Sequence, residues 1–411
     1  MMDKVLSNIN RSELIDLASD CVRIPTFKGE ETPLARYLAK WFEQRGYDVE
    51  LDEVEEGRFQ TIATLRGKGG GKSLMFNAHL DINSMTRGWN RDPWESWVEG
   101  DKLFGHGVQN MKGGLATMIV AADAFRKADV ALKGDIVLAC VVGETQGGEG
   151  THHLMERGVR TDAAILTEPY GRGNLCTKHS GILHLALHVR GKSAHLSQVE
   201  KSIHAVRKMA TIIERFDSLR FSAPHDPTLP GLPRHNIGAI IGGRGESYIL
   251  YDAPYIPDMC TLIVDVHFLP GQTVQAIVAD IEAHLAPLKE KDPDLSFDIE
   301  IPPPAFFKGR RRLAMPPCDV PTDAEIVRLV AKNYTSVSGN PIGTVGAVLP
   351  ESYTACDSSW LWKAGIPCLN YGPSTGGLEF SGPNGAYVVI SEMEEVAKVL
   401  ALTALDFCEA A

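Results

Sequence analysis

The chain has 411 residues, more than one hydrophobic core usually serves, so we expect two domains. Acidic residues outnumber basic ones by 52 to 41, and the net charge of −11 argues against nucleic acid as a partner. The sequence contains no run of about 20 apolar residues and no apolar signal-peptide core, so we expect no membrane partner and a cytoplasmic location. The eight cysteines are scattered without a Cys-x-x-Cys pair, which favours reduced thiols.

Helix and strand signals alternate in the first part of the chain. Apolar spacing predicts a helix that begins at Thr32 and ends before Gly46, and another helix over residues 112–128. Short apolar runs predict buried strands over residues 73–76, 135–142 and 163–167. This alternation predicts an α/β fold with a mostly parallel mixed sheet between helices.

The middle of the chain has a different order of elements, strand–helix–strand–strand–helix–strand. These elements are predicted over residues 183–189, 200–218, 236–242, 259–268, 274–285 and 295–301. The order is typical of a ferredoxin-like α+β domain. Because residues 320–411 return to alternating helices and strands, the smaller domain is predicted to be inserted into the larger one. We place the catalytic domain at 1–178 and 303–411, and the inserted domain at 179–302.

Polar residues follow three of the predicted strands, at the sheet edge where open α/β folds bind their ligands. His79 and Asp81 lie two residues apart on an extended segment, which suits a metal-binding imidazole supported by a carboxylate. Glu144 follows a very apolar strand, where burial would raise the pKa of its carboxyl and suit it as a general base. Glu168 is kept extended by Pro169. The alternative for His79 and Asp81 is a surface turn, and the alternative for Glu144 is an ordinary solvated glutamate in a turn.

A glycine-rich segment over residues 105–114 precedes the helix predicted over 112–128. Its glycines would let the backbone approach a ligand closely. The alternative is a glycine-rich entry to the helix, with Asn110 as the N-cap.

The order and spacing of these motifs resemble the family of acetylornithine deacetylase, succinyl-diaminopimelate desuccinylase, aminoacylase and carboxypeptidase G. The resemblance extends to the sequence Gly-Lys-Ser-Ala-His at 191–195 and to Tyr-Gly-Pro at 371–373. It implies a hydrolase in which divalent metals, usually two zinc ions, activate a water that attacks an amide carbonyl. The implied roles are metal ligand for His79, its support for Asp81, general base for Glu144, second ligand for Glu168, and oxyanion stabilisation, often across a dimer, for His195 of the inserted lid domain.

Three positions depart from the family pattern. Asn110 replaces an aspartate that bridges the two metals, Thr145 replaces a second glutamate, and Ser381 stands where the last histidine ligand is expected. An amide cannot bridge two cations as a carboxylate does, and hydroxyls are weak neutral ligands. His79, Glu168 and the Asn110 oxygen remain, so we expect one divalent metal ion per subunit, manganese or zinc. Thr145 and Ser381 would line the place of the lost metal.

A single metal can still lower the pKa of a bound water whose proton Glu144 accepts, so an enzyme is favoured over a non-catalytic binding homologue. With one metal lost, a substrate that disperses negative charge into itself is favoured. The leading prediction is therefore hydrolytic deamination of an electron-poor aromatic amine, which resembles the one-metal nitroanthranilate aminohydrolase type. The alternative is hydrolysis of an N-acyl amino acid or dipeptide. We expect a small-molecule substrate and a homodimer formed through the lid domain.

Overall fold

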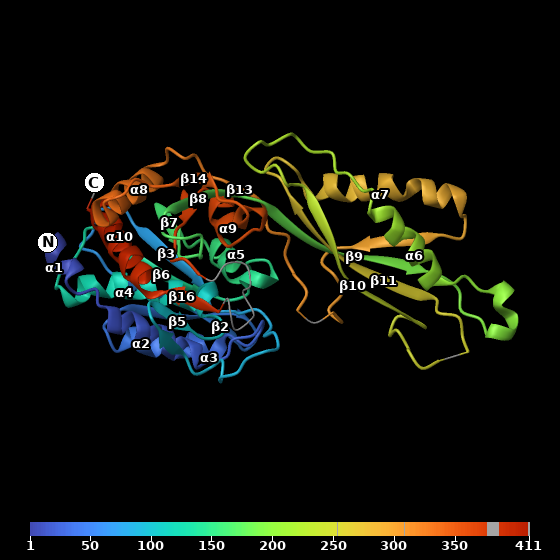
Figure 1. Ribbon diagram of the computed structural model, residues 1–411, viewed down its shortest axis with the longest axis horizontal. Coiled ribbons are helices and arrows are strands. Elements are labelled where there is room, and N and C mark those ends of the chain that lie inside the picture. Colours follow the sequence, from blue (N-terminus) through green and yellow to red (C-terminus); the bar gives the residue numbers. More distant parts are fainter. Residues whose placement is uncertain (253, 308, 376–385, 410–411) are drawn as a thin grey trace. The chain divides into compact units, whose positions relative to one another are not determined.

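The computed structural model describes residues 1–252, 254–307, 309–375 and 386–409, and the chain forms two compact units (Figure 1). Unit 1 comprises Met1–His179 and Cys318–Ala411, and unit 2 comprises Ser180–Pro317. The second junction therefore differs from the predicted one, because residues 303–317 belong to unit 2. Met315 forms an antiparallel bridge with Ile182 at the start of unit 2, so the Pro-rich stretch lies within that unit.

Unit 1 is an α/β unit built around one large sheet. Its helices are α1 (Met2–Leu6), α2 (Arg11–Val22), α3 (Thr32–Glu43), α4 (Gly113–Lys127), α5 (Glu149–Glu156), α8 (Glu325–Ser338), α9 (Ser358–Lys363) and α10 (Ile390–Cys408). The large sheet contains β1 (Asp48–Glu55), β2 (Arg58–Leu65), β3 (Leu74–His79), β6 (Ile136–Val141), β7 (Ala163–Leu166), β8 (Asn174–His179), β13 (Cys318–Asp319), β14 (Thr344–Ala347) and β15 (Cys368–Asn370). A small separate sheet contains β4 (Trp97–Glu99), β5 (Lys102–Phe104) and β16 (Tyr387–Val389).

The strand order of the large sheet decides where functional residues meet. The order is β1-β2-β6-β3-β7-β15-β8-β13, with β14 paired to β8. The pairs β6–β3, β3–β7, β7–β15 and β8–β14 are parallel, whereas β1–β2, β2–β6, β15–β8 and β8–β13 are antiparallel. The predicted α/β fold with a mostly parallel centre is therefore confirmed, and the carboxyl ends of the central strands share one edge.

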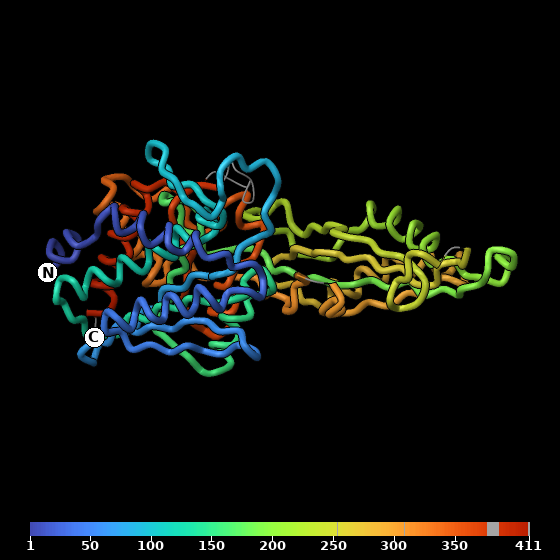
Figure 2. Tube along the Cα trace, turned by 90° about the horizontal axis from the view of Figure 1, so that it is seen from below, coloured from blue at the N-terminus to red at the C-terminus, as the bar shows by residue number. Residues whose placement is uncertain are grey.

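Burial explains why the central elements form as they do. Every residue of β3 is buried, as expected for a strand covered on both faces. Helix α4 is buried over nearly its whole length, and its small Ala and Gly residues let it lie close to the sheet and to α2 and α10. Helix α1 contacts α10, so the first and last helices of the chain lie side by side in unit 1 (Figures 1 and 2).

Unit 2 is the predicted ferredoxin-like α+β domain. It contains β9 (Gly181–Arg190), α6 (Ala205–Phe216), β10 (Arg234–Gly243), β11 (Met259–Phe268), α7 (Val274–Lys291) and β12 (Ser296–Glu300). The sheet order β10-β11-β9-β12 is antiparallel throughout. Its core packs residues of β9 and β11 against apolar side chains of α6 and α7, including Met209, Ile212, Ile277 and Ile281. Within the described parts of both units, no helix is long and apolar enough to cross a membrane.

Candidate metal centre and catalytic site

The three strand ends chosen from the sequence come together in unit 1. His79 is the last residue of β3 and pairs in parallel register with Val141, the last residue of β6. On the other side of β3, Asn77 pairs with Leu166, the last residue of β7. Glu144 follows β6 and Glu168 follows β7, so the two carboxylates flank His79 at one edge of the sheet.

The imidazole of His79 is oriented for binding a cation. Its Nδ1–H donates to the main-chain carbonyl of Asp81 over 2.8 Å, so in the neutral ring Nε2 carries the lone pair. Nε2 lies 2.8 Å from Oδ1 of Asn110 and 3.8 Å from Oε1 of Glu168. Ligand atoms that share an ion at about 2.0–2.2 Å lie about 3–4 Å apart, and the separation of Nε2 from the Glu168 oxygen is in this range, whereas its separation from the Asn110 oxygen is that of a hydrogen bond.

The charges around His79 also favour a cation. Burial alone would lower the pKa of His79, but the carboxylates of Glu168, Asp81 and Glu144 outweigh it and raise the pKa to about 10. Negative charge therefore dominates the surroundings of this ring. Burial raises the pKa of Glu168 to about 7 against the opposing effect of His79, and Glu144 and Asp81 add to the rise.

Asn110 is a side-chain partner of His79 and not an N-cap. Helix α4 begins at Gly113, and Asn110 has an extended backbone in the segment η1 (Val108–Lys112) before it. Gly107 starts η1 with a positive φ, and a β-carbon there would lie 2.5 Å from Cγ2 of Ile82. Position 107 needs a positive φ and has no room for a β-carbon, and only glycine satisfies both conditions. This explains why the segment next to the end of β3 is rich in glycine.

Asp81 supports the site differently from the prediction. Its main-chain carbonyl holds the His79 ring, whereas its carboxylate lies 3.7 Å from Nδ1 and accepts the N–H groups of Glu144 and Thr145, each over 3.0 Å. Burial would raise the pKa of Asp81, but His79 and the donors of Thr145 and Glu144 hold it below its usual value. The Thr145 hydroxyl donates to the same carboxylate. Asp81 thus links His79 to the segment that carries Glu144.

Asp357 is a fourth carboxylate at the site that sequence reasoning missed. It is buried, and neither of its oxygens has a hydrogen-bond partner among the residues that the structure describes. A β-carbon at Gly148 would lie 2.7 Å from Oδ1 of Asp357, so the carboxylate packs against the segment that follows Glu144. Burial and then Glu144 raise the pKa of Asp357 well above its usual value, whereas His79 lowers it. An acidic residue before a short helix would be expected to cap it, but Asp357 makes no cap hydrogen bond. A buried, unpartnered carboxylate supports the fit to a cation.

Two other predicted residues lie outside the described part of unit 1. Ser381 lies outside the described residues. His195 belongs to unit 2, where its exposed ring accepts the N–H of Ser197 and contacts the ring of Tyr255. Among the residues that are described, no three His, Cys, Asp or Glu side chains are gathered closely enough to hold a metal. The candidate centre of His79, Asn110 and Glu168 is consistent with that finding, because one of its three donors is an amide.

The start of α4 lies against the segment that carries Glu168. A β-carbon at Gly114 would lie 2.2 Å from the carbonyl oxygen of Thr167. We expect Gly114→Ala to lower the free energy of unfolding by about 1–3 kcal/mol through overpacking, although alanine is the better helix former. Thermal unfolding measures the effect. Gly173→Ala is the control, since its nearest contact would be 3.7 Å away, and an unchanged Gly114→Ala stability would contradict the close approach.

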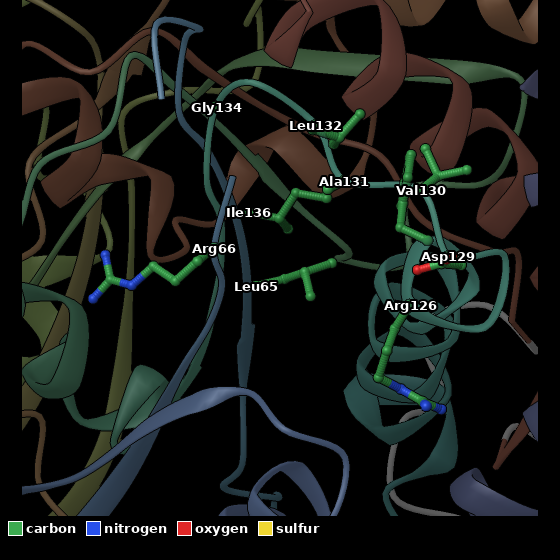
Figure 3. A pocket seen from close by; sticks show the side chains of 10 residues that line it. Leu65, Arg66, Arg126, Asp129, Val130, Ala131, Leu132, Gly134 and Ile136 are labelled. Atoms are coloured by element: carbon green, nitrogen blue, oxygen red, sulfur yellow. The ribbon is translucent and has the colours of Figure 1, made fainter. Parts of the chain in front are cut away.

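The pocket drawn in Figure 3 is separate from this centre. It has a volume of about 160 Å³ and is lined by Leu65, Arg66, Phe125, Arg126, Asp129, Val130, Ala131, Leu132, Gly134 and Ile136. Ile136 is the first residue of β6, whereas Glu144 follows the last. The pocket therefore lies at the opposite edge of the sheet.

An α/β sheet that presents a histidine, an amide and several buried carboxylates at its carboxyl edge, with a glutamate positioned beside them, defines a metal-dependent hydrolase. The sequence profile of the peptidase family M20/M25/M40 matches residues 75–406, and the chain belongs to this family. It is thus a metallohydrolase that acts on C–N bonds, as the resemblance implied, and enzymes of this family bind divalent metal ions, usually two. The reading as a non-catalytic homologue is not supported.

Individual relatives agree with this assignment. The chain is 27% identical to N-formyl-4-amino-5-aminomethyl-2-methylpyrimidine deformylase of Halalkalibacterium halodurans, over 99% of the chain and 98% of the relative. It is 26% identical to acetylornithine deacetylase of Proteus mirabilis, over 98% of both chains. Among solved structures, a dipeptidase from Saccharomyces cerevisiae shares the fold with a TM-score of 0.77 at 12% identity, covering 100% of this chain and 99% of that one.

Proposed function

We propose that the enzyme hydrolyses the amide bond of a small N-acyl amine, using one divalent metal ion and Glu144 as general base. The observation that supports this most directly is the convergence of His79 Nε2, Asn110 Oδ1 and Glu168 Oε1 next to the segment that carries Glu144. A metal bound there would lower the pKa of a water molecule and polarise the substrate carbonyl. Manganese and zinc both suit one imidazole, one carboxylate and one amide oxygen.

The protein's own residues would carry out the proton transfers. Glu144 accepts a proton from the water that attacks the acyl carbon, and it returns a proton to the nitrogen that leaves. The C–N bond breaks, and the products are a carboxylic acid and an amine. Asp81 holds the backbone of Glu144 through this cycle, since its carboxylate accepts the N–H of that residue.

The relatives that cover the whole chain favour an amide over an aryl amine as substrate. One is named as a deformylase of an aminopyrimidine and the other as an acetylornithine deacetylase, and both names describe removal of a small acyl group. The predicted deamination of an electron-poor aromatic amine remains the second candidate. It rests on the same replacements at Asn110 and Thr145 that favour one metal. The homodimer through the lid domain and the cytoplasmic location also stay predictions.

A substrate panel with a metal count tests the proposal. We expect the purified protein to bind about one equivalent of manganese or zinc in elemental analysis, and to deacylate N-formyl or N-acetyl amines faster than it releases ammonia from nitroanthranilates. Two tightly bound equivalents would contradict the single-metal assignment. Ammonia release from the aromatic amines alone would favour the second candidate, and turnover of neither group by the metal-loaded protein would contradict both.

A further inference from the structure

A buried arginine, Arg58, contacts the segment that carries Glu144. Arg58, the first residue of β2, is 3% exposed, and its guanidinium makes five hydrogen bonds. Nε and Nη2 donate to the two carboxylate oxygens of Glu31 over 2.9 and 2.5 Å, and Nη1 donates to Glu149 over 2.7 Å and to Glu55 over 3.0 Å. Nη2 also donates to Oε1 of Gln146 over 2.8 Å.

Two of these partners belong to the segment that presents the base. Gln146 ends the short 3-10 turn that Glu144 begins, and Glu149 lies in the first turn of α5 directly after it. Gly143, which precedes Glu144, is also in contact, because a β-carbon there would lie 2.9 Å from Nη2 of Arg58. The guanidinium therefore contacts residues before, within and after the turn Glu144–Gln146.

The turn is held from other directions as well. The Asp81 carboxylate accepts the N–H groups at its start, and the indole N–H of Trp360 donates to the carbonyl of Gly147 over 2.8 Å. Glycines at 143, 147 and 148 all have positive φ, so little in the local backbone preference defines this conformation. Backbone hydrogen bonds within the segment, such as Gln146 N–H to the Gly143 carbonyl, and the side-chain contacts together hold this conformation.

The positive charge of Arg58 strengthens its hydrogen bonds to the segment around Glu144. Burial would lower the pKa of Arg58, but Glu31 and Glu149 outweigh it and raise the pKa above its ordinary value, so the guanidinium stays charged. Its planar fork meets Glu31 in a two-point pair that fixes its orientation. The neutral Gln146 side chain then receives a directed N–H from a rigid donor.

We propose that Arg58 is a positioning residue for the general base. Its Nη2–H bond to Gln146 holds the turn Glu144–Gln146 so that the Glu144 carboxylate faces the metal position. The inference rests on the proposed function, because it takes Glu144 as the base. This proposal gives β2 a part in catalysis, although β2 lies two strands away from β3 in the sheet.

The experiment removes the hydrogen bond between Arg58 and Gln146 in the turn. Gln146→Met keeps the size of the side chain and loses the acceptor, whereas Gln146→Glu keeps an acceptor for Arg58. Glu55→Gln is the matched control, because Glu55 is also a partner of Arg58 but lies outside the turn. All are compared as full-length, metal-loaded proteins, with kcat and KM for the best substrate of the panel, the metal content, and hydrogen–deuterium exchange over residues 143–149.

We expect Gln146→Met to lower kcat about tenfold, which is about 1.4 kcal/mol, with KM and metal content within about twofold of the parent. Exchange over 143–149 should rise in this variant only. Gln146→Glu should recover most of kcat, and Glu55→Gln should match the parent. If Gln146→Met does not fold, Arg58→Lys provides the second test with the same expected pattern.

The results separate this inference from the proposed function. Faster exchange with unchanged kcat would overturn the positioning role, and so would unchanged exchange. If the parent turns over no member of the panel, the proposed function fails, and the exchange comparison alone decides whether Arg58 orders the turn. A loss of metal in Gln146→Met would also contradict the inference, because the effect would then act on metal binding.

Discussion

Glu144→Gln is expected to lower kcat by about 10²- to 10⁴-fold while the protein keeps its metal, because the amide cannot accept the proton of the attacking water. Glutamine has nearly the same size as glutamate, so it should fit at position 144, where Glu144 is only 8% exposed. The N–H of residue 144 can still donate to Asp81, so the turn should remain in place. Steady-state kinetics with the best panel substrate measure the loss, and elemental analysis measures the metal.

The control for this prediction is Glu156→Gln at the end of α5. Its side chain is 74% exposed and lies outside the turn of the base, so kcat should match that of the parent. Activity retained within about tenfold in Glu144→Gln would show that another group accepts the proton. Asp357 would then be the next residue to test, since it is buried and packs on the same segment.

His79→Ala is expected to weaken metal binding by about a hundredfold or more. His79 contributes the nitrogen donor of the candidate centre, and even the loss of groups that merely orient a ligand commonly costs ten- to a hundredfold. Without this imidazole, Glu168 and the Asn110 oxygen would be left as two of the three proposed donors. Competition against a chelator of known affinity measures the change.

Because His79 is buried, we pair His79→Ala with a second variant in which the new side chain has the size of the one it replaces. Glu168→Gln should also weaken metal binding, since it replaces a carboxylate by a neutral amide. His225→Ala, an exposed histidine of unit 2, is the control and should bind metal as the parent does. Unchanged affinity in both His79→Ala and Glu168→Gln would place the metal elsewhere in the protein.

Much of the fold could be predicted from apolar periodicity. The runs at 135–142 and 163–167 correspond to β6 and β7, and the run at 259–268 coincides with β11. Such buried strands are easy to recognise because the sheet is covered on both faces. The Pro-rich boundary at 302–304 was misleading. The bridge that closes unit 2 forms at Met315, between residues far apart in the sequence.

Some residues of the candidate site could likewise be predicted from the sequence, and others could not. His79, Glu144 and Glu168 could be chosen from sequence because each follows an apolar strand, and parallel pairing of β6, β3 and β7 brings such strand ends together. Asn110 could be chosen from the family resemblance, but its neighbourhood suggested an N-cap equally well. Its pairing with His79 depends on how η1 passes the end of β3.

By itself, the sequence determined the α/β and ferredoxin-like architecture and the residue types available for metal binding and proton transfer, because periodicity and strand-end position are local properties of the chain. Only the tertiary structure decided that the Asp81 carboxylate accepts the N–H of Glu144, that Asp357 is buried without a partner among the described residues, and that Arg58 contacts the turn of Glu144. These contacts join residues between 63 and 88 positions apart, or depend on burial by distant elements, and no local pattern records them.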